Sequence, residues 1–217
     1  MDIPILYADA HVVVLNKPAG LAVHPGPGGG ASVEDIFASL SRRADGPWLA
    51  HRLDADTAGC LVVALRKTPL LKLQAAFAAG AVRKTYWAVV EGEVAGEAGT
   101  ISAPIIKRSH WQGWAMAVDA KGQESITDWR VLGRTSGQTW LELSPRTGRT
   151  HQLRVHCAHG GWPILGDALY GTAGPGLHLL ARRIVLPLDP VIDVTAPPPL
   201  AMVEALAACG RKEGLLF

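Results

Sequence analysis

The chain has 217 residues, of which 48% are hydrophobic and 18% charged, and its formal net charge is +2. This composition excludes disorder as the main state, because it supplies enough apolar surface to bury a core. The three cysteines are odd in number and form no C-x-x-C pair, so neither a disulfide framework nor a zinc ribbon is expected, and a reducing cytoplasm fits best.

The N-terminal segment, residues 1–5, carries an acid where a signal peptide would need cations. Apolar runs stay well short of the ~18 to 20 residues of a membrane span. We therefore expect a soluble, cytoplasmic protein. The small net charge permits a nucleic-acid partner without arguing for one, so such an argument depends on where the charges lie.

The first elements are a buried strand and a long loop. Residues 12–15 (VVVL) are β-branched enough to form a strand. Residues 17–30 hold three prolines and five glycines, which predicts a loop of a length that is often functional. Ser32, followed three residues later by Asp35, predicts a short helix that runs through about Ala44.

A polar stretch, residues 51–59 (HRLDADTAG), precedes an apolar strand at residues 60–65. Folding alone explains such a run poorly, so we interpret it as a functional loop on a rigid scaffold. Asp56 comes before a turn-like sequence and is expected to cap that turn. Asp54 has no such local role and suits a nucleophile or an electrostatic stabiliser, although a partly exposed salt bridge with Arg52 is the structural alternative.

A helix and a strand follow this loop. Residues 70–79 are predicted to be helical, with Thr68 as the N-cap, Pro69 at the first helical position and Gly80 as the stop. Residues 82–92 alternate as a strand does, which puts Lys84 and Tyr86 on one face.

Residues 93–134 are predicted to form short strands and turns, and a basic and aromatic patch, residues 107–114 (KRSHWQGW), lies inside them. Interleaved cations and tryptophans are what stacking on unpaired bases requires. The alternative is a hairpin whose tryptophans cover the edge of the core.

After a strand at residues 139–143, the stretch 144–171 concentrates cations and histidines in a loop that becomes a helix near Thr150 and ends at Gly160. Arginines at the start of a helix predict an anion site. A metal site is not expected, because the histidine spacing is poor and the nearest acid, Asp167, lies beyond a turn. The residues in question are Arg146, Arg149, Arg154, His151, His156 and His159.

The chain closes with a strand at residues 177–186, a rigid spacer at residues 197–199 and a helix at residues 200–208 stopped by Gly210. We see no repeat and no interdomain linker, so we expect one domain over residues 1–217 with two strand-rich halves.

Four motifs follow one another along the chain: residues 16–20 (NKPAG), 51–54 (HRLD) with Thr57 and Gly59, 84–86 (KTY), and 147–156 (TGRTHQLRVH) followed by residues 163–164, 166–167 and 170–171. In this order they resemble the motifs of the RluA-type RNA pseudouridine synthases. The resemblance implies an α+β fold, a long mixed, mostly antiparallel sheet with flanking helices and a central RNA-binding cleft, and no extra N-terminal RNA-binding module.

By this resemblance the catalytic aspartate is Asp54, the active-site tyrosine is Tyr86, and the basic partner of the aspartate is Arg154, with Arg149 as the alternative. Arg52 matches an arginine thought to help displace the target base. Ala58 departs from the serine of many relatives. The further residues expected to contact substrate or RNA are His51, Lys84, Arg149, Thr150 and His151.

The implied activity is isomerisation of specific uridines to pseudouridine in structured ribosomal or transfer RNA by a monomer, without cofactor or metal. Asp54 would either add covalently to C1' or take the 2' proton, and the sequence leaves both open. The competing interpretations are a non-catalytic RNA-binding or ribosome-assembly factor, and a metal hydrolase that uses His156, His159 and Asp167.

Overall fold

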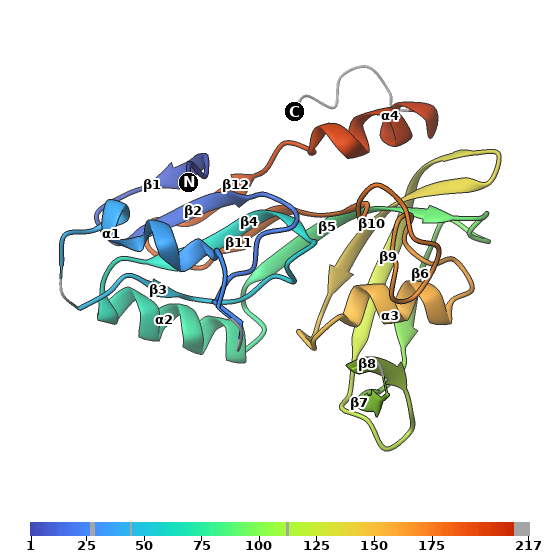
Figure 1. Cartoon of the computed structure of the whole chain (residues 1–217), viewed down its shortest axis with the longest axis horizontal. Coiled ribbons are helices and arrows are strands. Elements are labelled where there is room, and N and C mark those ends of the chain that lie inside the picture. Colours follow the sequence, from blue (N-terminus) through green and yellow to red (C-terminus); the bar gives the residue numbers. More distant parts are fainter. Residues whose placement is uncertain (27–28, 44, 112, 211–217) are drawn as a thin grey trace. The chain divides into compact units, whose positions relative to one another are not determined.

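The computed structural model describes residues 1–26, 29–43, 45–111 and 113–210, and the chain divides into two compact units (Figure 1). The first unit combines Met1–Lys84 with Leu180–Pro198. The second combines Thr85–Leu179 with the chain from Pro199 onward. Each unit therefore contains segments that are far apart in sequence.

The first unit is built on a mixed sheet with β4 (Ala58–Ala64) inside it. β4 pairs antiparallel with β2 and β3 and parallel with β11, where Leu180 faces Ala58. Every residue of β4 is buried, as expected of a strand with neighbours on both edges. The other strands are β1 (Ile5–Ala8), β2 (Val12–Lys17), β3 (Trp48–Leu49), β11 (Leu179–Leu186) and β12 (Ile192–Thr195).

Short helices complete this unit. The capping box at Ser32 is present as predicted and starts the 3-10 helix η1 (Val33–Ile36), which continues as α1 (Phe37–Leu40). The helix ends earlier than expected because Ser41 is extended, and Ala44 lies outside the described residues. α2 (Lys67–Ala78) buries Leu73 against the unit's interior.

The second unit contains an antiparallel sheet in the order β5, β10, β9, β6. A separate two-stranded pair, β7 and β8, forms a hairpin. The strands are β5 (Arg83–Glu91), β6 (Ala98–Ser102), β7 (Ile105–His110), β8 (Gly113–Val118), β9 (Ile126–Thr135) and β10 (Gln138–Pro145), and the helices are α3 (Gln152–His159) and α4 (Leu200–Ala208).

The core of the second unit joins α3 to the sheet. Leu153 and Cys157 of α3 pack with Ala88 and Val90 of β5, and Tyr86 lies partly buried against the same cluster. The predicted alternation of this strand is therefore confirmed for the face that carries Tyr86. The structure agrees with the predicted α+β class, with mostly antiparallel pairing.

The starts of two helices also differ from those predicted. The N-cap of α2 is Arg66, not Thr68, and Pro69 lies at the third helical position. α3 begins at Gln152, with His151 as its N-cap in the left-handed region (φ 54°). No helix in the described part of the chain is long and apolar enough to cross a bilayer.

Candidate functional site

The polar loop of residues 51–59 leads into β4 in the first unit. Asp54 is half-buried, and its carbonyl oxygen accepts a hydrogen bond from the Thr57 N–H at 3.1 Å, which closes a turn. Gly59, at the start of β4, has φ +110°, and a Cβ there would lie 2.3 Å from the carbonyl oxygen of Ala181. Only glycine fits at this exit from the loop.

The side chain of Lys17 holds the loop of residues 51–59 in place. Its side chain is fully buried, and Nζ donates hydrogen bonds to the carbonyl oxygens of Pro18, Leu21 and Ala55 at 2.8, 2.8 and 2.7 Å. Burial lowers the pKa of Lys17 to about 8, while the charges of Asp56 and then Asp54 oppose that shift. Three carbonyl acceptors use all three donors of an ammonium, so Lys17 ties the loop that carries Asp54 to the loop after β2.

His51 serves the scaffold of the loop. Its Nε2 accepts a hydrogen bond from the Val62 N–H at 3.0 Å, and its ring lies 5.0 Å from the ring of Phe77. Burial, followed by the charge of Lys84, lowers the pKa of His51 to about 4. The ring is therefore neutral near pH 7 and carries no positive charge for a phosphate. This geometry favours a structural role over the RNA contact expected from the sequence.

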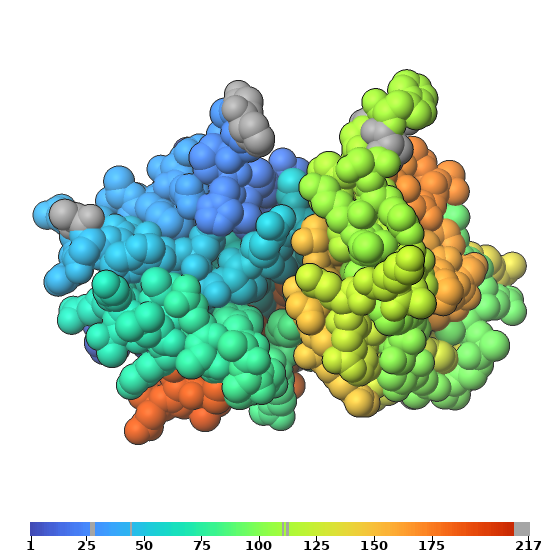
Figure 2. Space-filling view, turned by 90° about the horizontal axis from the view of Figure 1, so that it is seen from below, coloured from blue at the N-terminus to red at the C-terminus, as the bar shows by residue number. Residues whose placement is uncertain are grey.

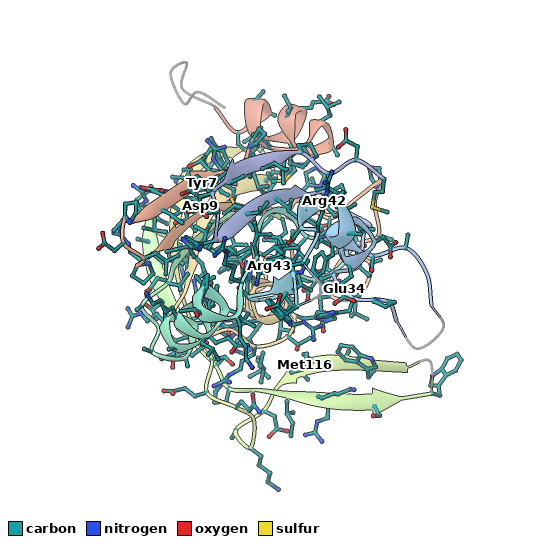
Figure 3. The ribbon with its side chains drawn as sticks, turned by 90° about the vertical axis from the view of Figure 1, so that its left-hand side faces the viewer. Tyr7, Asp9, Glu34, Arg42, Arg43 and Met116 are labelled. Carbon is teal, nitrogen blue, oxygen red and sulfur yellow. The ribbon has the colours of Figure 1, made fainter. Side chains whose placement is uncertain are left out.

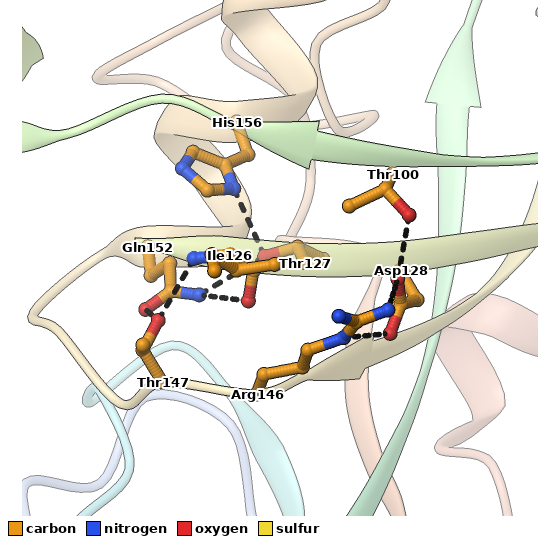
Figure 4. Close-up of polar contacts among 8 residues, drawn as sticks. All are labelled: Thr100, Ile126, Thr127, Asp128, Arg146, Thr147, Gln152 and His156. Carbon is orange, nitrogen blue, oxygen red and sulfur yellow. Dashed lines mark hydrogen bonds and ion pairs between the residues drawn. The ribbon is translucent and has the colours of Figure 1, made fainter. Parts of the chain in front are cut away.

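In the second unit, a glutamine organises the turn before α3 (Figure 4). Gln152 is buried, and its Oε1 accepts hydrogen bonds from the Thr147 hydroxyl at 2.7 Å and the Arg149 N–H at 3.0 Å. Its Nε2 donates to the Ile126 carbonyl and to the Thr127 hydroxyl, both at 3.0 Å. The amide thus fastens the motif loop to β9.

Arg154, one turn into α3, forms a buried bidentate ion pair with Asp167. Its Nε and Nη2 donate to the two carboxylate oxygens at 2.8 and 2.7 Å, and the two side chains are 7% and 0% exposed. Asp167 also accepts the N–H groups of Leu169 and Tyr170. Burial alone raises the pKa of Asp167, but the ion pair and these N–H groups outweigh it, so the net shift is downward.

A chain of aromatic contacts runs from this ion pair to the hairpin. The Tyr170 ring lies 5.2 Å from the Arg154 guanidinium, and its hydroxyl accepts the Met116 N–H at 2.9 Å. The phenolic proton is then available for His151 Nδ1, which lies 2.8 Å away. His151 in turn stacks on Trp114 of β8, with ring centroids 5.2 Å apart and 19° between planes.

Two of the three arginines near the start of α3 pair with carboxylates of the second unit. Arg146 pairs with Asp128 at 2.7 Å (Figure 4), and Arg154 pairs with Asp167, so both charges already have carboxylate partners. Arg149 is exposed, and its Nε donates to the carbonyl of Glu124 at 3.2 Å. Arg149 is therefore the better placed of the three to contact a phosphate.

The remaining predicted residues differ in accessibility. Arg52 is exposed, whereas Thr150 and Lys84 are half-buried, and burial lowers the pKa of Lys84. In the first unit the structure brings His51 within electrostatic range of Lys84, and Lys17 within range of Asp54. In the second it brings His151 and Arg154 together around Tyr170.

The histidines considered for a metal have other partners. His156 is buried, with Nδ1 2.9 Å from the Thr127 hydroxyl and Nε2 3.0 Å from the Ala103 carbonyl. Burial lowers its pKa. Asp167 is committed to Arg154. Among the residues that the structure describes, no group of three or more His, Cys, Asp or Glu side chains is arranged to hold a metal ion.

Sequence reasoning missed three positions that support the loops. Lys17 and Gln152 looked like ordinary motif members, and Tyr170 carried no assigned role. Each is polar inside an apolar or structured stretch, and that is the signal that could have identified them.

Solved structures with the same architecture give the class. Human RNA Pseudouridylate Synthase Domain Containing 4 matches with a TM-score of 0.81 and 29% identity, covering 94% of this chain and 92% of that chain. Human RNA Pseudouridylate Synthase Domain Containing 1 matches with a TM-score of 0.76 and 29% identity, covering 96% and 87%. These likenesses define a pseudouridylate synthase fold.

Sequence comparisons agree. The family model described as RNA pseudouridylate synthase matches residues 11–159. An uncharacterized RNA pseudouridine synthase of Zymomonas mobilis is 42% identical over 173 residues, which are 77% of this chain and 78% of the relative. The ribosomal large subunit pseudouridine synthase C of Escherichia coli is 36% identical over 96% of this chain and 69% of that protein.

The chain belongs to the RNA pseudouridylate synthase family, and as an enzyme it is an isomerase. The predicted family is thereby confirmed. Several relatives are considerably longer, since the chain spans only 54% of the ribosomal large subunit pseudouridine synthase C of Buchnera aphidicola.

Proposed function

We propose that this protein converts specific uridines of structured ribosomal or transfer RNA into pseudouridine, with Asp54 as the catalytic residue and without a cofactor. The observation that carries the proposal is the family match over residues 11–159, which include the loop of Asp54. Relatives named for the ribosomal large subunit favour ribosomal RNA as the first substrate to test.

The chemistry suits the residues. The N1–C1' bond of the uridine breaks and a C5–C1' bond forms, while C5 loses a proton and N1 gains one. Atoms and electrons balance without an oxidant or water. Asp54 would act on the ribose, either by adding to C1' or by taking the 2' proton. Tyr86 would lie beside the uracil and help to remove the C5 proton.

The support around Asp54 favours a catalytic role over a simple surface salt bridge. The turn closed by Thr57, the three hydrogen bonds of Lys17 and the obligatory glycine at position 59 hold the loop in one conformation. A reacting group held in this way needs little reorganisation when substrate binds. Arg52 is exposed on the same loop, where it could help to displace the target base.

The test compares wild type with Asp54→Asn and Asp56→Asn. Asp56 is a matched control because it lies two residues away, carries the same charge and also acts on Lys17. Each protein is incubated with unmodified ribosomal and transfer RNA transcripts, and pseudouridine is mapped by carbodiimide-dependent primer stops. We expect stops with wild type and Asp56→Asn, and none with Asp54→Asn.

Thermal unfolding and RNA binding of the Asp54→Asn variant are measured in parallel and are expected to stay near wild type. Stops formed by Asp54→Asn would refute its catalytic role. Equal loss in both variants would assign the effect to the charge of the loop, and no stops with wild type on bound RNA would favour a non-catalytic binding protein.

A further inference from the structure

The β7–β8 hairpin carries an aromatic side chain that folding does not explain. Trp111, at its turn, is 89% exposed, and Trp114 at the start of β8 is 40% exposed. The hairpin lies on the surface as the lime-green segment of the second unit in Figure 2. The expectation that these tryptophans cover the edge of the core is therefore wrong for Trp111. An indole left in water contributes nothing to the core, and its ring remains accessible to a partner.

The base of the hairpin is ordered by side chains of the second unit. Trp114 stacks on His151, and Lys107 Nζ lies 4.5 Å from the centroid of the Trp114 ring. On β8, at the position opposite Lys107, the Met116 N–H donates a hydrogen bond to the Tyr170 hydroxyl. Figure 3 shows β7 and β8 as a long two-stranded arm that bears Met116. Trp111 is thus presented at the end of an arm whose root is fixed, which lowers the entropic cost of binding through it.

The charge of the hairpin indicates the kind of partner. Residues 105–118 contain Lys107 and Arg108 and no acidic residue. Arg108 pairs with Asp119, just beyond β8, while Lys107 remains exposed beside Trp114. A hairpin that combines exposed indoles with an exposed lysine and has no acidic residue of its own complements nucleobases and phosphates better than it complements an apolar peptide.

We propose that Trp111 is a stacking platform for one unpaired base of the RNA substrate, with Lys107, further along the hairpin beside Trp114, contacting the RNA backbone. This inference rests on the proposed function and deepens it, because it assigns the substrate to RNA with a single-stranded loop or bulge at the point of contact. Trp114 is already engaged by His151 and Lys107, so its role is to hold the arm.

The test measures the affinity of wild type, Trp111→Ala and Trp111→Phe for two RNAs by fluorescence anisotropy at one salt concentration. One RNA is a stem-loop with uridines in its loop, and the other is the same stem as a continuous duplex. Leu71→Ala is the matched control, since Leu71 is another exposed apolar side chain, on α2. Loss of one stacked base is expected to weaken stem-loop binding by about 5- to 150-fold.

We expect Trp111→Ala to show this loss on the stem-loop only, Trp111→Phe to retain most of the affinity, and Leu71→Ala to bind as wild type does. Unchanged stem-loop binding by Trp111→Ala, or an equal loss on both RNAs, would overturn the proposal. So would a wild-type self-association that Trp111→Ala abolishes while RNA binding is unaffected. Binding is read independently of product, so failure of the proposed catalysis would be seen separately with Asp54→Asn.

Discussion

Replacing Asp167 with alanine is expected to destabilise the second unit by about 5 to 7 kcal/mol. The change removes the Asp167 carboxylate from the buried ion pair with Arg154, and breaking a buried pair on one side costs about 3 to 5 kcal/mol. It also removes the acceptor of two N–H groups, each worth about 1 kcal/mol. Since whole domains are stable by only about 5 to 15 kcal/mol, such a loss is large.

Urea unfolding followed by tryptophan fluorescence suits this prediction, because six of the seven tryptophans belong to the second unit. The matched control is Asp128→Ala. The pair of Asp128 with Arg146 is also bidentate, at 2.7 and 2.8 Å, but its side chains are 35% and 61% exposed. Exposed pairs contribute at most about 1 kcal/mol, so this variant is expected to stay near wild type.

The prediction would be refuted by a loss below about 1 kcal/mol for Asp167→Ala, or by equal losses in the two variants. Acid provides a second readout. The pKa of Asp167 is lowered in the folded state, so the stability it contributes is present above its unfolded pKa and disappears as the pH falls through the folded one.

Two further changes test the supports of the loops. Gln152→Leu removes the hydrogen bonds that the amide makes to its buried partners, and it is expected to lower the free energy of unfolding in urea by about 1 to 3 kcal/mol. A loss below about 0.5 kcal/mol would contradict the hydrogen-bond network drawn in Figure 4. His51→Gln tests the lowered pKa of His51. Between about pH 6.5 and pH 4 the unfolded chain takes up a proton at His51 and the folded chain does not. The free energy of unfolding of the wild type therefore decreases as the pH is lowered through this window. The variant should show a shallower fall, and identical pH profiles of the unfolding free energy would argue against a neutral, buried His51.

Local sequence signals were sufficient to predict the bounds of an element where proline or glycine residues stand directly at its ends. The helix at residues 200–208 was predicted with its exact bounds, because proline precedes it and Gly210, with φ +83°, follows its end. α2 shows where such signals fail. Its first N–H groups need no intrahelical partner, so proline is tolerated at the third position and the helix starts before Thr68.

Long-range pairing limited what the sequence could reveal about the candidate site. The motif placed Arg154 among the functional residues, but its partner Asp167 lies thirteen residues further on, across a turn whose path only the fold determines. Lys17 likewise ends an apolar strand, and its role emerges only when the carbonyl of Ala55 is brought to it. The roles of Asp54, Tyr86 and Arg52, and of Arg154 or Arg149 as the basic partner of Asp54, remain predictions.

The pairing of β4 with β11 has a consequence for how the chain is made. Leu180 and Ala58 are neighbours in the sheet, although 122 residues separate them, and the first unit takes its last strands from Leu180–Pro198. During synthesis the positions of β4 that pair with β11, Ala58 and Gly59, therefore lack these partners until residues 85–179 have been translated. Because contacts of such sequence separation close slowly, the sheet of the first unit, and with it the loop that carries Asp54, is expected to reach its final structure late in folding.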